Sequence, residues 1–434
     1  MFPIMLPMVQ SMSRVPLRIS RVPPLIKRNM WFFALSQSFT GAGMQFAFGL
    51  GPLMVIALTG SAALAGLSVM LLGISRFVVA YPIGRITDRY GRKPGIQLGL
   101  ALALVGGMLT GWSMSLKSFP TMFFGMLIFG MGMYASQQLR VAATDMVPAR
   151  MRGRALGYVG MGLTVGVLAS PLFVIAGERL ALRFDGDPLG TPWLLMPLLI
   201  LPGMLLVMFV RPDPKQIGTD LHRYFPGEAP VQSAGRHVEF STRRLLAHVP
   251  SRLAIVANTA AVGNMAVVMV LTSLVLQHHG HSLGEIAFSH ALHATGMFAF
   301  SIPVGWMADR FGRGRVMYPG VAVTLLGAGL VAFTTPYWSV TLGTFLVGLG
   351  WAGANIAATA AIADYVATEE RGRAIGVTDS FAGGINVVVA LITGPLVEWY
   401  GLPAAGLCAV VIAVIPLVMR LAYHGNLRAA QARA

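Results

Sequence analysis

Long apolar segments, separated by short polar ones, make up almost the whole chain. Each apolar segment has about 20 residues or more, which is the length an α-helix needs to cross the hydrocarbon core of a bilayer. The pattern predicts twelve membrane-spanning helices, at residues 30–58, 61–84, 95–116, 119–146, 154–177, 192–210, 250–276, 282–305, 316–334, 338–363, 373–397 and 402–421. We therefore expect an all-α integral membrane protein.

The composition supports a membrane protein and excludes the main soluble classes. Hydrophobic residues make up 55% of the chain and charged residues 11%, whereas soluble domains carry about 25% charged residues. Intrinsic disorder needs the opposite composition. A single cysteine, Cys408, excludes a disulfide scaffold. The 51 glycines suit membrane helices, whose backbones pack closely at small residues.

The formal net charge of +16 is distributed unevenly across the predicted membrane. Of the 32 Lys and Arg residues, 27 lie in the two tails, the linker and the loops after even-numbered segments, and only Lys117, Arg179 and Arg183 lie on the other side. Positive loops stay in the cytoplasm, so both termini are predicted to be cytoplasmic in a bacterial inner membrane. Because the charge is spread over seven short segments, nucleic-acid binding is not expected.

An internal repeat divides the chain into two halves. One loop motif occurs after the second segment and again 221 residues later, as Gly84, Asp88, Arg89, Gly91 and Arg92 and then as Gly305, Asp309, Arg310, Gly312 and Arg313. An Arg-Gly-Arg-Ala string also occurs twice, preceded once by Asp145 and once by Asp364. The repeat predicts an N-terminal tail, a six-helix bundle, a linker, a second six-helix bundle and a C-terminal tail, at residues 1–29, 30–210, 211–249, 250–421 and 422–434.

These motifs resemble those of the major facilitator superfamily, over about residues 30–421. The resemblance implies two pseudo-symmetric bundles that rock about a central cavity. It also implies that Asp88 caps the start of the eleventh segment and that Arg92 pairs with Asp145. The mirrored set around the fifth segment is Asp309, Arg313 and Asp364. This conformational latch is expected to hold the outward-open state and to break when the halves rock. The alternative is a solvated basic loop that only sets topology.

Three charged residues lie well inside predicted segments, where charge is costly and marks functional sites. Arg76 lies about 12 Å from the cytoplasmic end of the second segment, and Asp379 lies at a similar depth in the eleventh. We expect an Arg76–Asp379 pair that forms and breaks, with Asp379 as the candidate proton carrier. A permanent ion pair is the alternative. Arg140 either attracts an anionic substrate or acts as a gate residue.

Uncharged polar residues recur at equivalent positions of the segments that the resemblance places around the cavity. Gln37 matches Asn258 at the 221-residue offset, and Ser136 matches Asn355 at 219 residues. Such groups orient a ligand in an apolar cleft, although they also bond between membrane helices. The predicted cavity set is completed by Gln45, Tyr134, Gln137, Asn264 and Trp351.

Histidines form two groups. His290 and His293 lie one helical turn apart in the eighth segment, where they either shuttle protons or are simply packed. The histidines within residues 278–281 have only Glu285 at a ligand spacing. We therefore predict no metal and no cofactor.

The predicted function is secondary active transport of a small molecule by rocker-switch alternating access, coupled to protons. Export of a hydrophobic or amphiphilic compound is favoured over import or exchange of a small organic anion. No GxxxxGK[ST] loop is present to use ATP, and the lack of HExxH and GxSxG argues against a membrane enzyme. A transport-dead receptor on the same fold is the third class. A monomer in the lipid bilayer is expected.

Overall fold

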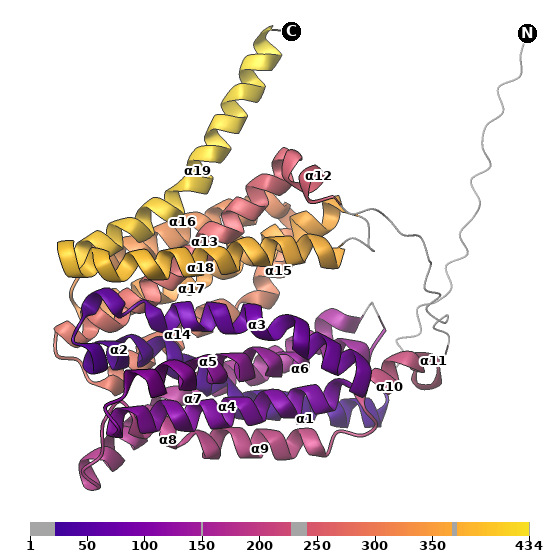
Figure 1. Ribbon diagram of the computed structural model, residues 1–434. Helices are drawn as coiled ribbons and strands as arrows, with labels where there is room; N and C mark the ends of the chain where they lie inside the picture. The colour runs from indigo at the N-terminus through magenta and orange to yellow at the C-terminus, as the bar shows by residue number, and fades with distance from the viewer. Residues whose placement is uncertain (1–21, 149–150, 227–240, 367–370, 434) are drawn as a thin grey trace, which may run out of the picture.

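The computed structural model describes residues 22–148, 151–226, 241–366 and 371–433, and within them the chain is helical with short turns and no strand (Figure 1). Helices satisfy every backbone hydrogen bond within one segment, as a lipid environment requires. Two helical bundles lie side by side, one from each half of the chain (Figure 1).

The first bundle contains α1 to α9. Its elements are α1 (Pro24–Gly49), α2 (Gly51–Thr59), the short 3₁₀ helix η1 (Ala62–Leu64), α3 (Leu67–Tyr90), α4 (Arg92–Ser115), α5 (Phe119–Ser136), α6 (Gln138–Asp145), α7 (Arg152–Arg183), α8 (Thr191–Leu194) and α9 (Met196–Met208). The linker carries three short helices, which are α10 (Pro214–Thr219), α11 (Leu221–Tyr224) and α12 (Thr242–Ala247).

The second bundle contains α13 to α19. Its elements are α13 (Val249–His278), α14 (Leu283–Phe298), α15 (Ser301–Phe311), α16 (Arg313–Phe333), α17 (Tyr337–Tyr365), α18 (Arg371–Tyr400) and α19 (Leu402–Arg433). The last turns of α19 extend beyond the bundle (Figure 1). The end of the bundles that carries α10, α11 and α12 is called the linker end, and the opposite end carries η1.

Each of the twelve predicted segments corresponds to a helix or to a pair of helices. Within the described residues, ten helices are long and apolar enough to cross a membrane, and α1 with α2 forms an eleventh span bent by 41°. The bend lies at Leu50, between Gly49 and the Gly51-Pro52 pair, and Pro52 cannot donate a backbone bond. The eighth segment is divided into α14 and α15, and neither part alone is long enough to cross a membrane.

Glycines at repeated positions allow the closest helix contacts in both bundles. A Cβ atom on Gly106 of α4 would lie 2.1 Å from the backbone nitrogen of Phe129 in α5. Gly327 of α16, at the 221-residue offset, would place a Cβ 2.5 Å from the carbonyl oxygen of Gly343 in α17. Any larger side chain would separate these helices, so the repeat keeps the same packing seam in each half.

Candidate functional site

A cavity of 310 Å³ lies between the two bundles and is lined by both of them. Side chains from α1, α3, α5, α6 and α7 face others from α13, α14, α17 and α18 across it. Its apolar wall consists mainly of methionine and phenylalanine, including Met44, Phe48, Met133, Met265, Met269 and Met297. This volume is within the range of small-molecule sites.

Eight of the nine predicted cavity residues line this space, namely Gln37, Gln45, Tyr134, Ser136, Gln137, Asn258, Trp351 and Asn355. Asn264 does not, and its assignment to the cavity is wrong. Its side-chain nitrogen donates to the carbonyl oxygen of Ala409 in α19 at 2.7 Å. Six residues beyond Asn258 the helix has turned by about 240°, so Asn264 points into the second bundle instead.

The expected contact between Arg76 and Asp379 is present on the cavity wall. Arg76 Nη2 lies 3.3 Å from Asp379 Oδ2, and the two side chains are 46% and 48% exposed. The pair joins α3 of the first bundle to α18 of the second. Arg76 also lies over the ring of Tyr134, 5.7 Å from its centroid. That the pair opens and closes during transport stays a prediction.

Arg140 has an aromatic partner rather than an acidic one. Its guanidinium lies 5.8 Å from the centroid of the Phe298 ring, and Phe298 in turn contacts Trp351 edge to face at 6.5 Å. Within the described part of the chain, no carboxylate forms an ion pair with Arg140. Arg140 therefore brings to the cavity a positive charge that no carboxylate of the described residues pairs with.

Two of the predicted amides bond to each other. Asn355 Nδ2 of α17 donates to Asn258 Oδ1 of α13 at 2.7 Å. This contact matches the interhelical alternative for these two residues, although both also line the cavity. Asn258 keeps its own NH₂ donors and Asn355 its oxygen, so each has capacity left for a ligand.

The two histidines of α14 have different surroundings. His293 lines the cavity, and its Nδ1 contacts the carbonyl oxygen of Thr344 at 2.8 Å. His290 lies outside the cavity, with Nε2 2.8 Å from Ser273 Oγ. Both rings are buried. No sequence signal distinguished them, because their orientation depends on how α14 packs between neighbouring helices.

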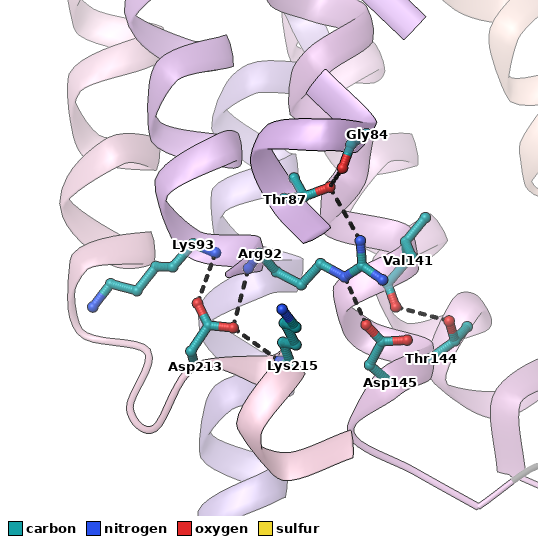
Figure 2. A network of polar contacts seen from close by, with 9 residues as sticks. All are labelled: Gly84, Thr87, Arg92, Lys93, Val141, Thr144, Asp145, Asp213 and Lys215. Atoms are coloured by element: carbon teal, nitrogen blue, oxygen red, sulfur yellow. Dashed lines mark hydrogen bonds and ion pairs between the residues drawn. The ribbon is translucent and has the colours of Figure 1, made fainter. Parts of the chain in front are cut away.

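The loop motif of the first half forms a compact polar network at the linker end (Figure 2). Arg92 Nε donates to Asp145 Oδ2 at 2.7 Å, and Arg92 Nη1 donates to Thr87 Oγ1 at 3.1 Å. Both partners belong to the first bundle, so this pair joins α4 to α6 rather than one half to the other. The expected cap by Asp88 at the start of the eleventh segment falls outside the described part of the chain, because the side chains of Asp88 and of the first residues of α18 are not described.

Sequence reasoning missed the residue that completes this network, Asp213 (Figure 2). Its carboxylate accepts from the backbone nitrogens of Arg92 at 3.1 Å, Lys93 at 2.9 Å and Lys215 at 2.9 Å. One side chain from the linker therefore caps the start of α4 and of α10, where helices offer free N–H groups and positive potential. The Asp213-Pro214 dipeptide was the available signal, because Asp before a first-turn Pro is typical of a helix start.

The second copy of the motif pairs within its own bundle as well. Arg313 Nε donates to Asp364 Oδ2 at 3.0 Å, and Arg313 also pairs with Asp309. Gly91 and Gly312 occupy equivalent turns with φ of +104° and +96°, a region that disfavours side chains. Arg89 lies over the ring of Tyr90, and Arg310 over that of Trp306.

At the opposite end the two bundles are in direct contact. Glu398 of α18 accepts hydrogen bonds from Ser61 Oγ and from the backbone nitrogen of Ala63, both at 2.7 Å. Beside it, a Cβ on Gly394 would lie 1.7 Å from the carbonyl oxygen of Ala63. The motif glycine Gly84, at the linker end, has no other heavy atom within 4 Å of its Cβ position. The bundles are therefore in contact at the opposite end, whereas Gly84 at the linker end has open space beside it.

A comparison with known proteins identifies the family. The sequence model of the Major Facilitator Superfamily matches residues 33–250 and 253–431. The chain belongs to this superfamily. It is therefore a multi-pass membrane transporter for small molecules, as the repeated motifs predicted. The transporters of this superfamily are not enzymes.

Individual relatives cover most of the chain. An uncharacterized transporter of the superfamily from Bacillus subtilis, YdeG, is 29% identical over 361 residues, which are 82% of each chain. The riboflavin transporter RfnT of Brucella anthropi is 26% identical over 418 residues, which are 92% of this chain and 97% of that one.

Solved structures of the superfamily share the fold. The nucleoside transporter NupG superimposes with a TM-score of 0.64 at 14% identity, covering 93% of this chain and 99% of that one. An inward-open structure of the xylose transporter XylE from E. coli gives 0.65 at 14% identity, covering 90% and 95%. At these identities the likeness concerns the fold alone.

Proposed function

We propose that this protein is a proton-coupled secondary transporter that works by rocker-switch alternating access. The observation that carries the proposal is the Arg76–Asp379 pair, because it joins the two bundles on the wall of the cavity between them. A contact across that interface must change when the bundles rock. Charge inside a membrane is costly, so the ionisable residues found there are candidates for a functional role.

Proton coupling follows from the chemistry of this pair. While the bundles are positioned as here, Arg76 neutralises the Asp379 carboxylate. When rocking withdraws the arginine, Asp379 can take up a proton and so avoid carrying an unpaired charge. Protonation and conformational change are then linked, which allows a proton gradient to drive a substrate across the membrane.

The orientation of the molecule follows from its surface charge. The linker end carries most of the Lys and Arg residues, so we assign it to the cytoplasm of a bacterial cell, with both termini inside. The described conformation is then inward-facing, since the bundles are sealed by Glu398 at the other end.

The substrate is proposed to be a small amphiphilic molecule. The methionine and phenylalanine wall of the cavity supports export of a hydrophobic or amphiphilic compound. Import or exchange of an organic anion is the second candidate, and it is favoured by Arg140, which forms no ion pair with a carboxylate of the described residues. Because the relative RfnT is a riboflavin transporter, riboflavin is a reasonable test compound.

The test measures Asp379→Asn in proteoliposomes loaded with radiolabelled riboflavin, 4-hydroxybenzoate or ethidium. We expect the variant to keep exchange of the transported compound but to lose accumulation driven by a pH gradient, by about tenfold or more. Exchange needs only rocking, whereas accumulation needs the proton. Asp185→Asn, in an exposed loop at the opposite end, is the matched control and should behave as wild type.

Two results would contradict the proposal. If Asp379→Asn accumulates the compound as well as wild type does, Asp379 is not the coupling group and a permanent ion pair is the better interpretation. If wild-type protein binds a compound but moves none, the chain is a receptor on a transporter fold.

A further inference from the structure

Several polar groups at the cavity have no partner within the protein. Gln45 Oε1, His293 Nε2 and Trp351 Nε1 are buried and lack any hydrogen bond in the described structure, and all three residues line the cavity. Buried polar atoms are almost always paired, and an unpaired one costs free energy. Arg140 adds a charged group without an acidic partner in the described part of the chain. Of the ten unpaired buried side-chain atoms among the described residues, three belong to residues that line this cavity, and these three indicate what its ligand must supply.

These groups separate into two acceptors and two donors. The Thr344 carbonyl can only accept, so His293 Nδ1 carries the hydrogen of that bond and Nε2 of the neutral ring is an acceptor. Gln45 Oε1 is also an acceptor. The indole N–H of Trp351 and the guanidinium of Arg140 are donors only.

The donors and the acceptors lie at different depths. Arg140 and Trp351 both contact Phe298, which lies five residues beyond His293 on α14, or about 7.5 Å along the helix axis. Gln45 lies near the level of His293, because a Cβ on Gly49 of α1 would lie 3.1 Å from the His290 ring of α14. Gln45 lies four residues before Gly49, and His293 lies three residues after His290. Each acceptor is therefore about one helical turn closer to the linker end than this contact is. The donor pair is therefore closer to the linker end than the acceptor pair.

The charge balance of the cavity selects between neutral and anionic ligands. Asp379 is the acidic residue among those that line the cavity, and Arg76 already neutralises it. The positive charge of Arg140 remains, in a space walled by methionine and aromatic rings where electrostatic attraction is stronger than in water. An anionic group beside Arg140 would balance it and form charge-assisted hydrogen bonds.

We propose that the cavity binds an organic acid with an apolar body and a hydrogen-bond donor at its far end. The acid group contacts Arg140 and Trp351, and an O–H or N–H group about 7 Å away bonds to His293 and Gln45. The apolar body packs against the methionine wall. The proposal rests on the transport function only in using the same cavity, and binding can be measured without transport.

The first experiment uses three matched probes and isothermal titration calorimetry on the purified full-length protein. 4-Hydroxybenzoate has both ends, 4-methoxybenzoate lacks the donor, and 4-hydroxybenzamide lacks the charge. We expect 4-hydroxybenzoate to bind about tenfold more tightly than either of the others, because 4-methoxybenzoate loses a hydrogen bond to a buried acceptor and 4-hydroxybenzamide loses the charge-assisted contact with Arg140. Equal binding of the three probes, or no binding of 4-hydroxybenzoate at millimolar concentration, overturns the proposal.

Variants then assign each end of the ligand. Arg140→Met should abolish the preference for 4-hydroxybenzoate over the benzamide, and Arg140→Lys, which keeps the charge, should restore most of it. The matched control is Arg183→Met, since Arg183 also lies over a phenylalanine ring, at 5.9 Å, but outside the cavity. His293→Phe should abolish the preference for the hydroxyl over the methoxy group and keep the preference for the acid.

Failure of the inference and failure of the proposed function give different results. Selective binding that responds to Arg140→Met, without any flux in proteoliposomes, contradicts transport and supports the inference. Proton-driven flux of ethidium or riboflavin with no acid preference in calorimetry supports transport and overturns the inference. If Arg140→Met elutes as aggregate, the three probes on wild-type protein and the His293→Phe variant still decide. Equal binding of the probes by wild type is sufficient to reject the site.

Discussion

Three arginines of the first bundle differ in the groups that they contact. Arg92 pairs with Asp145 inside one bundle, at 2.7 Å, and Arg76 pairs with Asp379 between bundles, at 3.3 Å. Arg140 has the Phe298 ring and the open cavity. The side chain is the same in each case, so the partner decides whether it stabilises one bundle, couples the two bundles or attracts a ligand.

Asp213 stabilises the junction between the linker and the first bundle, and its loss should lower the free energy of unfolding. We expect Asp213→Ala to lower the free energy of unfolding by about 1–2 kcal/mol, because three backbone N–H groups lose their capping carboxylate. Thermal unfolding in detergent measures the change as a lower midpoint. Asp220→Ala is the control, since Asp220 lies on the same linker, is exposed and makes no side-chain cap. An unchanged midpoint for Asp213→Ala would show that the cap is dispensable.

Among the elements, α18 is packed tightly against the first bundle near one end and loosely near the other. Toward the opposite end it approaches η1 and α3 so closely that only glycine fits, at Gly394 and, from the α3 side, at Gly66. Toward the linker end the same helix has open space around Gly376. One helix therefore holds the bundles together at one end and has open space beside it toward the other.

The seal predicts a conformational effect of one methyl group. Gly394→Ala places a Cβ 1.7 Å from the Ala63 carbonyl, so the two backbones must separate and the outward-open population should rise. The measurement is labelling of Met44→Cys, a cavity position, by an impermeant maleimide from outside the cell, in a Cys408→Ser background. We expect labelling about tenfold faster than with Gly394 intact, which corresponds to a shift of about 1.4 kcal/mol in the equilibrium.

The control for that experiment lies on the same helix. Gly376→Ala adds the same methyl group where no other heavy atom lies within 4 Å, so its labelling rate should equal that of the parent. Equal rates for both variants would mean that the Gly394 contact does not limit outward opening.

At the scale of the whole molecule, the repeat and the charge distribution determine two different properties. The repeat builds two bundles with the same packing seams, and the uneven charge orients both of them in the same membrane. The linker joins the bundles at the positively charged end and is fastened to the first one by Asp213. Arg28 adds to this attachment by donating to the carbonyl of Arg211.

The orientation predicts which positions a reagent reaches from outside the cell. In a Cys408→Ser background, Lys117→Cys should react with an impermeant maleimide in intact cells, because the loop between α4 and α5 lies at the opposite end. Thr219→Cys, exposed on the linker, should react only after the membrane is permeabilised. The reverse pattern would invert the assigned topology.

The sequence by itself determined the number and order of the spans, the division into halves, the family and most of the cavity residues. These properties follow from local periodicity, from composition and from a repeat, and each is readable along the chain. Even the Arg76–Asp379 contact could be anticipated, because both charges lie at the same depth in helices that the resemblance brings together.

Only the tertiary structure decided which face each side chain presents. Asn264 points to α19 and His293 to the cavity, although both lie in apolar helices with no periodic signal to orient them. The Asp213 cap and the Glu398 seal join residues more than 100 positions apart. Such contacts depend on how whole helices pack. In lipid no hydrophobic force drives helices together, so the sequence shows no apolar stripe that would mark the packed side of each helix.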